Sequence, residues 1–408
     1  MNKKLINLKA LIAILFTVAL IVFSEPAFNS AIDGLETWWE IVFPALLPFF
    51  IVAEILMGLG VVHFMGALLE PLMRPLFRIP GVGAFAVAIG LASGYPIGAK
   101  ITGNLRREGL CTKTEGERLV SFANTADPLF MIGAVAVGMF SNPQLGAILS
   151  LAHYASCLIV GFVLRFYKPN ATPKTDNSSP QQENIISYAF NELYNARKKD
   201  GRPFGQLLGD SIEESVKTLL TVGGFIIFFS VVTKILYLVG FNQLIAFILT
   251  FILEPLGFNQ ALISPIISGL FELTNGSYLA SQANAPLNQQ VIITSAIIAW
   301  SGLSVHAQVV AMVKGTDIKL KLYFFARILH AILAGALTYF LFDPLNAISS
   351  RLTIPVISTQ STGFSLGYLD YLAHMSIGLI LLFGFLTFIS LTFYIIKQLK
   401  VISFHHFK

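Results

Sequence analysis

The sequence predicts an all-α polytopic membrane protein with two inverted repeats, each containing a re-entrant broken helix, plus one N-terminal and one C-terminal span. Apolar residues make up 55% of the 408 residues and charged residues only 12%, with a mean hydropathy of +0.73. A soluble domain normally carries about 25% charged residues. Two apolar segments, at 90–100 and 269–277, are interrupted by glycines and polar residues. Such paired interruptions are typical of substrate sites in secondary transporters.

The N-terminal region, residues 1–40, contains one apolar span at Leu5–Phe23, preceded by Lys3 and Lys4. A cleaved signal peptide has the same layout, but no small-residue cleavage site follows the apolar segment, so we favour a retained span. An acidic external loop completes this region.

The first repeat is predicted at 41–167. It holds two conventional spans, an interfacial amphipathic helix, a broken element and the span after that element. In chain order these are Ile41–Val62, His63–Arg78, Val82–Lys100, Ser121–Phe140 and Ala147–Tyr167.

A polar linker at 168–217 separates the two halves, because it is rich in Asn, Ser, Pro and charge. The second repeat, at 218–342, has the same order of elements: Thr218–Val239, Phe241–Leu256, Gln260–Ala283, Val291–Val313 and Leu322–Phe342. The last region, 343–408, holds an external loop, the span Leu372–Ile396 and a tail.

The cations predict the topology. With a cytoplasmic N-terminus, all of the 27 Lys and Arg residues except Lys234, Arg327 and Arg351 fall in cytoplasmic segments. Cytoplasmic loops carry such an excess of positive charge. The first broken element then enters from the cytoplasm and the second from outside, so the two repeats are inverted.

The first break supplies five candidate substrate-binding residues: Ser93, Gly94, Tyr95, Gly98 and Lys100. Free N–H groups at the start of a half-helix attract an anion, and glycine lets the backbone approach it. Tyr95 offers a stacking face and Lys100 a positive charge. Two alternatives stay open: the glycines serve helix packing, and Lys100 extends to the membrane interface.

The second break supplies Glu272, Thr274, Asn275, Gly276 and Ser277. A carboxylate at membrane depth usually marks an ion or proton path. Glu272 is a candidate Na⁺ ligand, proton carrier or hydrogen-bond partner of the substrate. The alternative is a structural cap on a half-helix N-terminus, where Glu is also favoured.

The helix after each break carries polar residues at helical spacing. Asn124 and Asp127 follow the first break, and Ser304 and His306 follow the second. Polar side chains in a lipid-embedded helix must face protein or water, and His306 could carry a proton. Interhelical hydrogen bonding is the alternative, worth about 0.6 kcal/mol per bond.

Enzyme chemistry, a metal site and nucleic-acid binding are not expected. The chain lacks Gly-x-Ser-x-Gly, His-Glu-x-x-His and Walker motifs. The two cysteines, Cys111 and Cys157, lack metal-ligand spacing. The expected partners are a small anionic substrate and the bilayer, with no cofactor. A coupling Na⁺ or H⁺ and a homo-oligomer remain open.

At Gly90–Lys100 (Gly-Leu-Ala-Ser-Gly-Tyr-Pro-Ile-Gly-Ala-Lys) and at Phe271–Gly276 (Phe-Glu-Leu-Thr-Asn-Gly), the chain resembles the sporulation integral membrane protein family called YlbJ. That family belongs to the wider group with nucleoside-recognition, or Gate, domains. The resemblance covers nearly the whole chain. It implies a protein of the outer forespore membrane, made in the mother cell, that moves dipicolinic acid toward the spore and so supports cortex formation.

The resemblance also implies where the site lies. Gate relatives include concentrative nucleoside transporters, whose sites lie between two re-entrant hairpins and the helices that follow them. Those places match Ser93–Lys100 with Asn124–Asp127, and Glu272–Ser277 with Ser301–Gln308. The match is by position in the repeat, so it does not imply nucleoside specificity.

Two functions therefore compete. The first is membrane transport of a small organic anion, dipicolinate being the one that the resemblance implies. The second is a non-transporting scaffold or gate subunit of a sporulation membrane complex. Transport requires that the polar residues of both breaks converge, whereas a scaffold needs only its loops.

Overall fold

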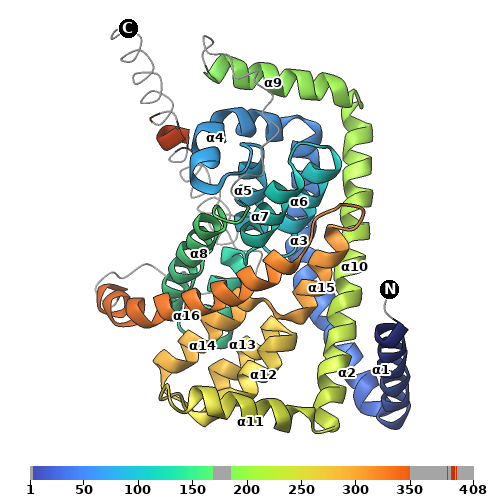
Figure 1. Ribbon diagram of the computed structural model, residues 1–408, viewed down its shortest axis with the longest axis vertical. Coiled ribbons are helices and arrows are strands. Elements are labelled where there is room, and N and C mark those ends of the chain that lie inside the picture. The colour runs from blue at the N-terminus through green and yellow to red at the C-terminus, as the bar shows by residue number, and fades with distance from the viewer. Residues whose placement is uncertain (1–2, 169–184, 350–383, 385–386, 391, 393–408) are drawn as a thin grey trace, which may run out of the picture.

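The computed structural model describes residues 3–168, 185–349, 384, 387–390 and 392, and these residues form helices and connecting turns without a strand (Figure 1). Four helices are long and apolar enough to cross a membrane, or up to six if each of two bent helix pairs counts as one span. The all-α polytopic class that the composition predicts is confirmed. Two predicted features, most of the C-terminal span and Thr175–Gln182 of the linker, lie outside the described residues.

The first half begins with α1 (Lys3–Val22) and α2 (Ser24–Thr37), followed by a π-helical turn η1 (Trp38–Val42). Then come α3 (Phe43–Gly58), α4 (Val61–Phe77), α5 (Gly83–Ser93), α6 (Ile97–Arg107), α7 (Lys113–Ala123), the π-helix η2 (Leu129–Met139) and α8 (Gln144–Leu164). The axis bends by 82° between α3 and α4, where the sequence predicts a change from a span to an interfacial helix.

The second half starts with α9 (Ile185–Asp200) and α10 (Phe204–Leu238). It continues with α11 (Phe241–Leu253), the 3-10 turn η3 (Gln260–Leu262), α12 (Ile263–Phe271), α13 (Leu273–Gln282), α14 (Leu287–Trp300), α15 (Gly302–Met312) and α16 (Lys321–Ser349). The 35 residues of α10 make a helix about 52 Å long at 1.5 Å per residue. This length exceeds a hydrocarbon core of about 30 Å, so the polar start of α10 projects beyond the membrane. The described second part of the predicted linker, residues 185–217, lies mainly in α9 and the start of α10.

Both predicted broken elements form helical hairpins. In the first, the arms α5 and α6 pack against each other and against α7. A methyl group added at Gly90 or at Gly98 would lie 2.0 Å from the carbonyl oxygen of Ala123. In the second, α12 packs against α13, and a methyl group at Gly276 would lie 2.3 Å from the Cα atom of Gly269. Only glycine permits these approaches.

The prediction of an acidic external loop is wrong, because residues 24–37 form helix α2. Its small buried residues, Ala27, Ser30 and Gly34, share one helical face. That face packs on α10, where a methyl group at Gly34 would lie 2.8 Å from Ser230 Oγ. The exposed acidic residues that suggested a loop occupy the remaining surface of an amphipathic helix.

The two spans predicted after the breaks are also interrupted. Residues 121–140 are divided between α7 and η2 by the non-helical segment Asn124–Asp127, and 291–313 are divided at Ser301, whose φ is +71°. Each half therefore contains two consecutive interruptions, one in the hairpin and one in the following span. Unpaired backbone groups survive at membrane depth only where protein or a water-filled cavity surrounds them.

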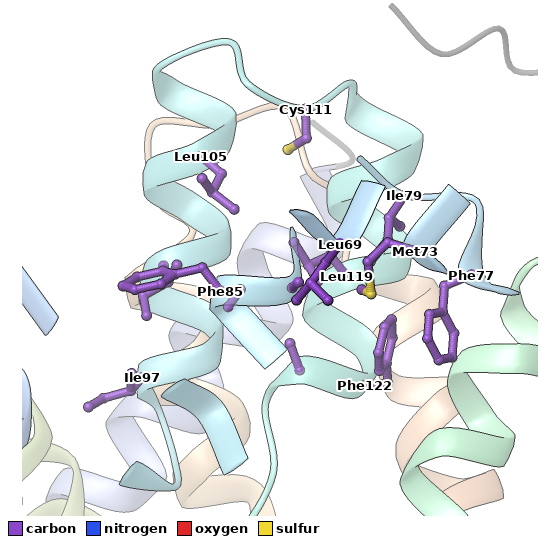
Figure 2. Close-up of a cluster of buried hydrophobic side chains, with 14 of the residues drawn as sticks. Leu69, Met73, Phe77, Ile79, Phe85, Ile97, Leu105, Cys111, Leu119 and Phe122 are labelled. Atoms are coloured by element: carbon purple, nitrogen blue, oxygen red, sulfur yellow. The ribbon is translucent and has the colours of Figure 1, made fainter. Parts of the chain in front are cut away.

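The main hydrophobic core packs around the first hairpin. Figure 2 shows Leu69, Met73 and Phe77 of α4 close to Leu119 and Phe122 of α7. The rings of Phe77 and Phe122 stack with centroids 5.0 Å apart. A second cluster joins the repeats, since it contains Ala99 of α6, Leu273 of α13 and Tyr323 of α16. The two hairpins consequently share one packed interior.

We expect Gly98→Ala to destabilise the first hairpin. The added methyl would overlap the Ala123 carbonyl oxygen at 2.0 Å, and backbone atoms have little freedom to move. The expected loss lies at the upper end of the roughly 1–3 kcal/mol typical of overpacking. Thermal unfolding in detergent measures it. Gly224→Ala is the matched control, because a methyl there meets nothing within 4 Å; equal melting temperatures for both variants would contradict the packing role.

Candidate functional site

The first hairpin break lies directly against the interruption of the following span. A methyl group at Gly94 would lie 2.4 Å from Asp127 Oδ2, and Gly94 has a φ of +75°. The other carboxylate oxygen of Asp127 accepts a hydrogen bond from the backbone N–H of Phe130 at 2.8 Å. Asp127 therefore caps the start of η2 while it packs on the hairpin tip.

The second hairpin break has the same relation to the second interrupted span. A methyl group at Gly302 would lie 2.9 Å from the Phe271 carbonyl oxygen and 3.1 Å from the Glu272 Cα atom. The Glu272 carboxylate accepts hydrogen bonds from the N–H groups of Thr274 (3.0 Å) and Asn275 (2.7 Å). Glu272 thus caps α13, which is the structural alternative that the sequence left open.

The last helical hydrogen bond of α14 runs from Ser301 N to Ile297 O. The three carbonyl groups after it, those of Ile298, Ala299 and Trp300, have no partner within the helix. Each of them accepts from a side chain. Tyr95 Oη donates to Ile298 O at 3.0 Å, and Arg327 Nη1 to Ala299 O at 3.4 Å. His306 Nε2 lies 2.8 Å from Trp300 O. The first hairpin thereby reaches across to the interrupted span of the second half.

Arg327 links both halves at this point. Its guanidinium is fully buried, and Nη2 donates to Ser121 O in the last turn of α7 at 2.8 Å. Nη1 also lies 3.3 Å from Tyr95 Oη. Two helix C-termini, each carrying a partial negative charge of about −0.5, hold the cation. The candidate residues from the sequence did not include Arg327. The signal was present, because Arg327 is one of three cations outside the predicted cytoplasmic segments and an intramembrane cation indicates a functional site.

Polar side chains from both halves surround Arg327. The Tyr323 ring lies 5.5 Å from the guanidinium carbon, and Asn124 Nδ2 donates to Tyr323 Oη at 3.4 Å. The His306 ring is 5.3 Å from that of Tyr323. His153 Nε2 accepts from Ala126 N at 3.2 Å, and its ring centroid lies 4.6 Å from that of His330. Tyr95, Asn124 and His306, predicted from opposite repeats, therefore do meet.

Lys100 points elsewhere. Its Nζ atom forms an ion pair with Glu54 Oε1 at 2.8 Å, donates to Thr218 Oγ1 at 3.0 Å and lies 3.9 Å from Glu214 Oε1. Glu54 and Glu214 line a cavity of about 350 Å³ with Asp210, Glu213, Ser211 and Arg202. Hydrogen bonds from Arg202 lower the pKa of Asp200, at the end of α9. Carboxylates outnumber cations around this cavity, so it does not favour an anion.

The remaining predicted residues have mixed positions. Ser93, Gly94, Gly98 and Gly276 are buried, and the Ser277 hydroxyl donates to Leu273 O at 2.7 Å. Ser304 Oγ accepts from Gln308 Nε2 at 3.4 Å. Thr274 is half-buried and Asn275 exposed. The described part of the chain holds no group of three or more His, Cys, Asp or Glu that could bind a metal ion.

Removing the Glu54 carboxylate should destabilise the protein, because the remaining carboxylate near Lys100 Nζ, that of Glu214, lies 3.9 Å away. Breaking a buried pair from one side costs about 3–5 kcal/mol, and we expect about 3 kcal/mol for Glu54→Gln. Adding Lys100→Met should restore much of the loss in thermal unfolding. Glu213→Gln, in the same cavity but without an ion pair to Lys100, is the control and should change little. A double variant no more stable than Glu54→Gln would refute the assigned pairing.

Comparisons with known proteins identify the family of the chain. The family model for nucleoside recognition, Gate, matches residues 39–163 and 219–316. The chain is 43% identical over 347 residues to the sporulation integral membrane protein YlbJ of Bacillus subtilis (strain 168), covering 85% of each chain. It is 32% identical over 168 residues to an uncharacterised protein of Alkalihalophilus pseudofirmus, covering 39% of this chain and 34% of that one.

A solved structure of a CNTnw double variant in an outward-facing state covers 81% of this chain and 87% of its own, at 12% identity. The TM-score is 0.36, too low to bear on fold or function. The family model and the Bacillus subtilis relative suffice: this chain belongs to the nucleoside-recognition (Gate) family and, within it, to the sporulation integral membrane protein YlbJ family.

Proposed function

We propose that this sporulation membrane protein is a transporter of a small organic anion. The observation that carries the proposal is the convergence of both interrupted halves on one place. Tyr95 from the first hairpin donates to Ile298 O at the end of α14, and Arg327 joins Tyr95, Ser121 and Ala299. A scaffold would not require polar residues of both halves to meet inside the helical core, whereas a transport site at a repeat interface does.

Dipicolinate is the substrate that we propose. It is a rigid aromatic dianion, and the convergence point combines a buried cation with the aromatic side chains of Tyr95 and Tyr323. Arg binds carboxylates and aromatic rings stack on flat ligands. The resemblance to the YlbJ family supports the same substrate and a location in the outer forespore membrane. Nucleosides, which the family description names, carry no charge and would leave the cation unused.

Further features belong to this proposal. The N-terminus lies in the cytoplasm, as the distribution of Lys and Arg favours, and the two repeats are inverted. The protein is not an enzyme and needs no cofactor. A gradient of Na⁺ or H⁺ drives transport.

Uptake by purified protein in liposomes tests the function. We expect labelled dipicolinate to enter under an inward Na⁺ or H⁺ gradient, and uridine not to compete. Tyr95→Phe should reduce the initial rate about tenfold, because the hydroxyl joins the hairpin to the second half, while a single neutral hydrogen bond changes stability by only about 1 kcal/mol. Tyr278→Phe is the matched control, since Tyr278 is 53% exposed on α13 and should transport normally.

Absence of uptake in every gradient, with folded protein confirmed by its unfolding transition, would overturn the transport function. The scaffold function would then be tested in sporulating cells by shortening residues 169–184. If the shortened variant fails to form spores and the Tyr95→Phe variant forms them normally, residues 169–184, and not the convergence point, carry the function in sporulation.

A further inference from the structure

Buried polar atoms without a hydrogen-bond partner concentrate around Arg327. Among the described residues, such atoms include Arg327 Nε, Asn124 Oδ1, Ser301 Oγ and the Nδ1 atoms of His153, His306 and His330. Ser301 Oγ lies close to the Tyr323 hydroxyl but makes no bond of ordinary geometry. Each unsatisfied buried group costs about 1–3 kcal/mol, so their grouping at one point indicates a place that binds something polar.

Among these groups, the Arg327 guanidinium is the one whose charge has the least compensation from its partners. All its bonded partners are neutral: the carbonyl oxygens of Ser121 and Ala299, and the Tyr95 hydroxyl. In the described part of the chain, no carboxylate lies within 4.0 Å of it, whereas buried Lys100 has Glu54 at 2.8 Å. Buried charges are normally paired with an opposite charge. Arg327 lies about 9 Å along α16 from Lys321, within the segment Lys321–Asp343 that is long and apolar enough to cross a membrane.

The orientation of the guanidinium leaves a binding edge. Its three bonds engage only Nη1 and Nη2, while Nε has no acceptor. A carboxylate can accept from Nε and Nη2 together, the bidentate geometry that favours Arg over Lys. Nearby, the Trp300 carbonyl accepts from His306 Nε2. That ring nitrogen then carries the proton, which leaves His306 Nδ1 to accept a hydrogen bond.

The geometry points to Arg327 as the residue that binds a carboxylate group of the transported anion. Its positive charge then selects anions over neutral molecules of the same shape. This inference rests on the proposed transport function and assigns its charge selectivity to one residue. Lys100, a candidate for this role from the sequence, is already paired with Glu54. The occupant is a small carboxylate whose negative charge completes the pairing of Arg327.

Binding to the full-length protein in nanodiscs tests the assignment. The probes are pyridine-2,6-dicarboxylate, the neutral pyridine-2,6-dicarboxamide of the same shape, and succinate as an aliphatic dicarboxylate. Wild-type protein should be stabilised in thermal unfolding by carboxylates and not by the diamide. Arg327→Gln should weaken carboxylate binding at least about tenfold, since truncating one partner of a buried charged pair mainly accelerates release. Arg327→Lys should bind with intermediate affinity.

Arg118→Gln is the matched control. Arg118 is also buried and donates to the carbonyls of Arg78, Tyr167 and Lys168, none of which belongs to the residues that surround Arg327. This variant should lose stability and keep its affinity for carboxylates.

Asn124→Asp provides a readout that does not require removing Arg327. The new carboxylate should pair with the guanidinium, raise the melting temperature without ligand and abolish stabilisation by anions.

The outcomes separate this inference from the proposed function. If dipicolinate binds to wild-type and Arg327→Gln proteins equally, the assignment of Arg327 fails and the function stands. If only succinate binds, and does so through Arg327, the proposed substrate fails and the assignment stands. If Asn124→Asp keeps wild-type anion binding, Arg327 is a structural residue only. If no carboxylate binds to wild-type protein, both fail.

Discussion

Every interruption of a helix inside the membrane leaves carbonyl and N–H groups that must find partners within the protein. In the described part of this molecule, the two hairpin breaks and the two broken spans meet that constraint together. The carbonyls that end α14 accept from Tyr95, Arg327 and His306. The carbonyls that end α7 accept from Arg327 and from Cys157, whose Sγ lies 3.0 Å from Phe122 O. Because the partners come from other helices, the interruptions fix how the two halves pack.

Lys100 and Arg327 are both buried, but their charges are held in different ways. Lys100 has a carboxylate partner, Glu54, at 2.8 Å, so its charge is neutralised within the protein and ties the first hairpin to α3 and α10. Arg327 is held by backbone dipoles, which offset only part of its charge. A paired cation contributes to structure, whereas an incompletely paired one retains affinity for an anion. The two roles are separated by the partners of the cation together with the unsatisfied polar atoms that gather around it.

Both helical hairpins follow from the sequence because glycines and polar residues interrupt apolar segments at matching places, and those interruptions are local properties. The span after each hairpin was predicted to be continuous, since Asn124–Asp127 and Ser301 are short polar insertions that an apolar helix can tolerate. The structure breaks both spans there, because the hairpin tips occupy the space beside them at Gly94 and Glu272. Helix α2 was missed for a related reason: its buried face of Ala27, Ser30 and Gly34 is recognisable only with α10 beside it.

The sequence by itself determined the membrane class, the repeated order of elements and the two hairpins, because composition, hydropathy and glycine act over short stretches of chain. It also placed Tyr95, Asn124 and His306 in the region where the halves meet. Only the tertiary structure decided the partners of each charge. It paired Lys100 with Glu54, used Glu272 to cap α13 and left Arg327 without a carboxylate partner among the residues that the structure describes. Those outcomes depend on contacts between residues more than 40 positions apart or on the exact turn of a helix end, which no local pattern encodes.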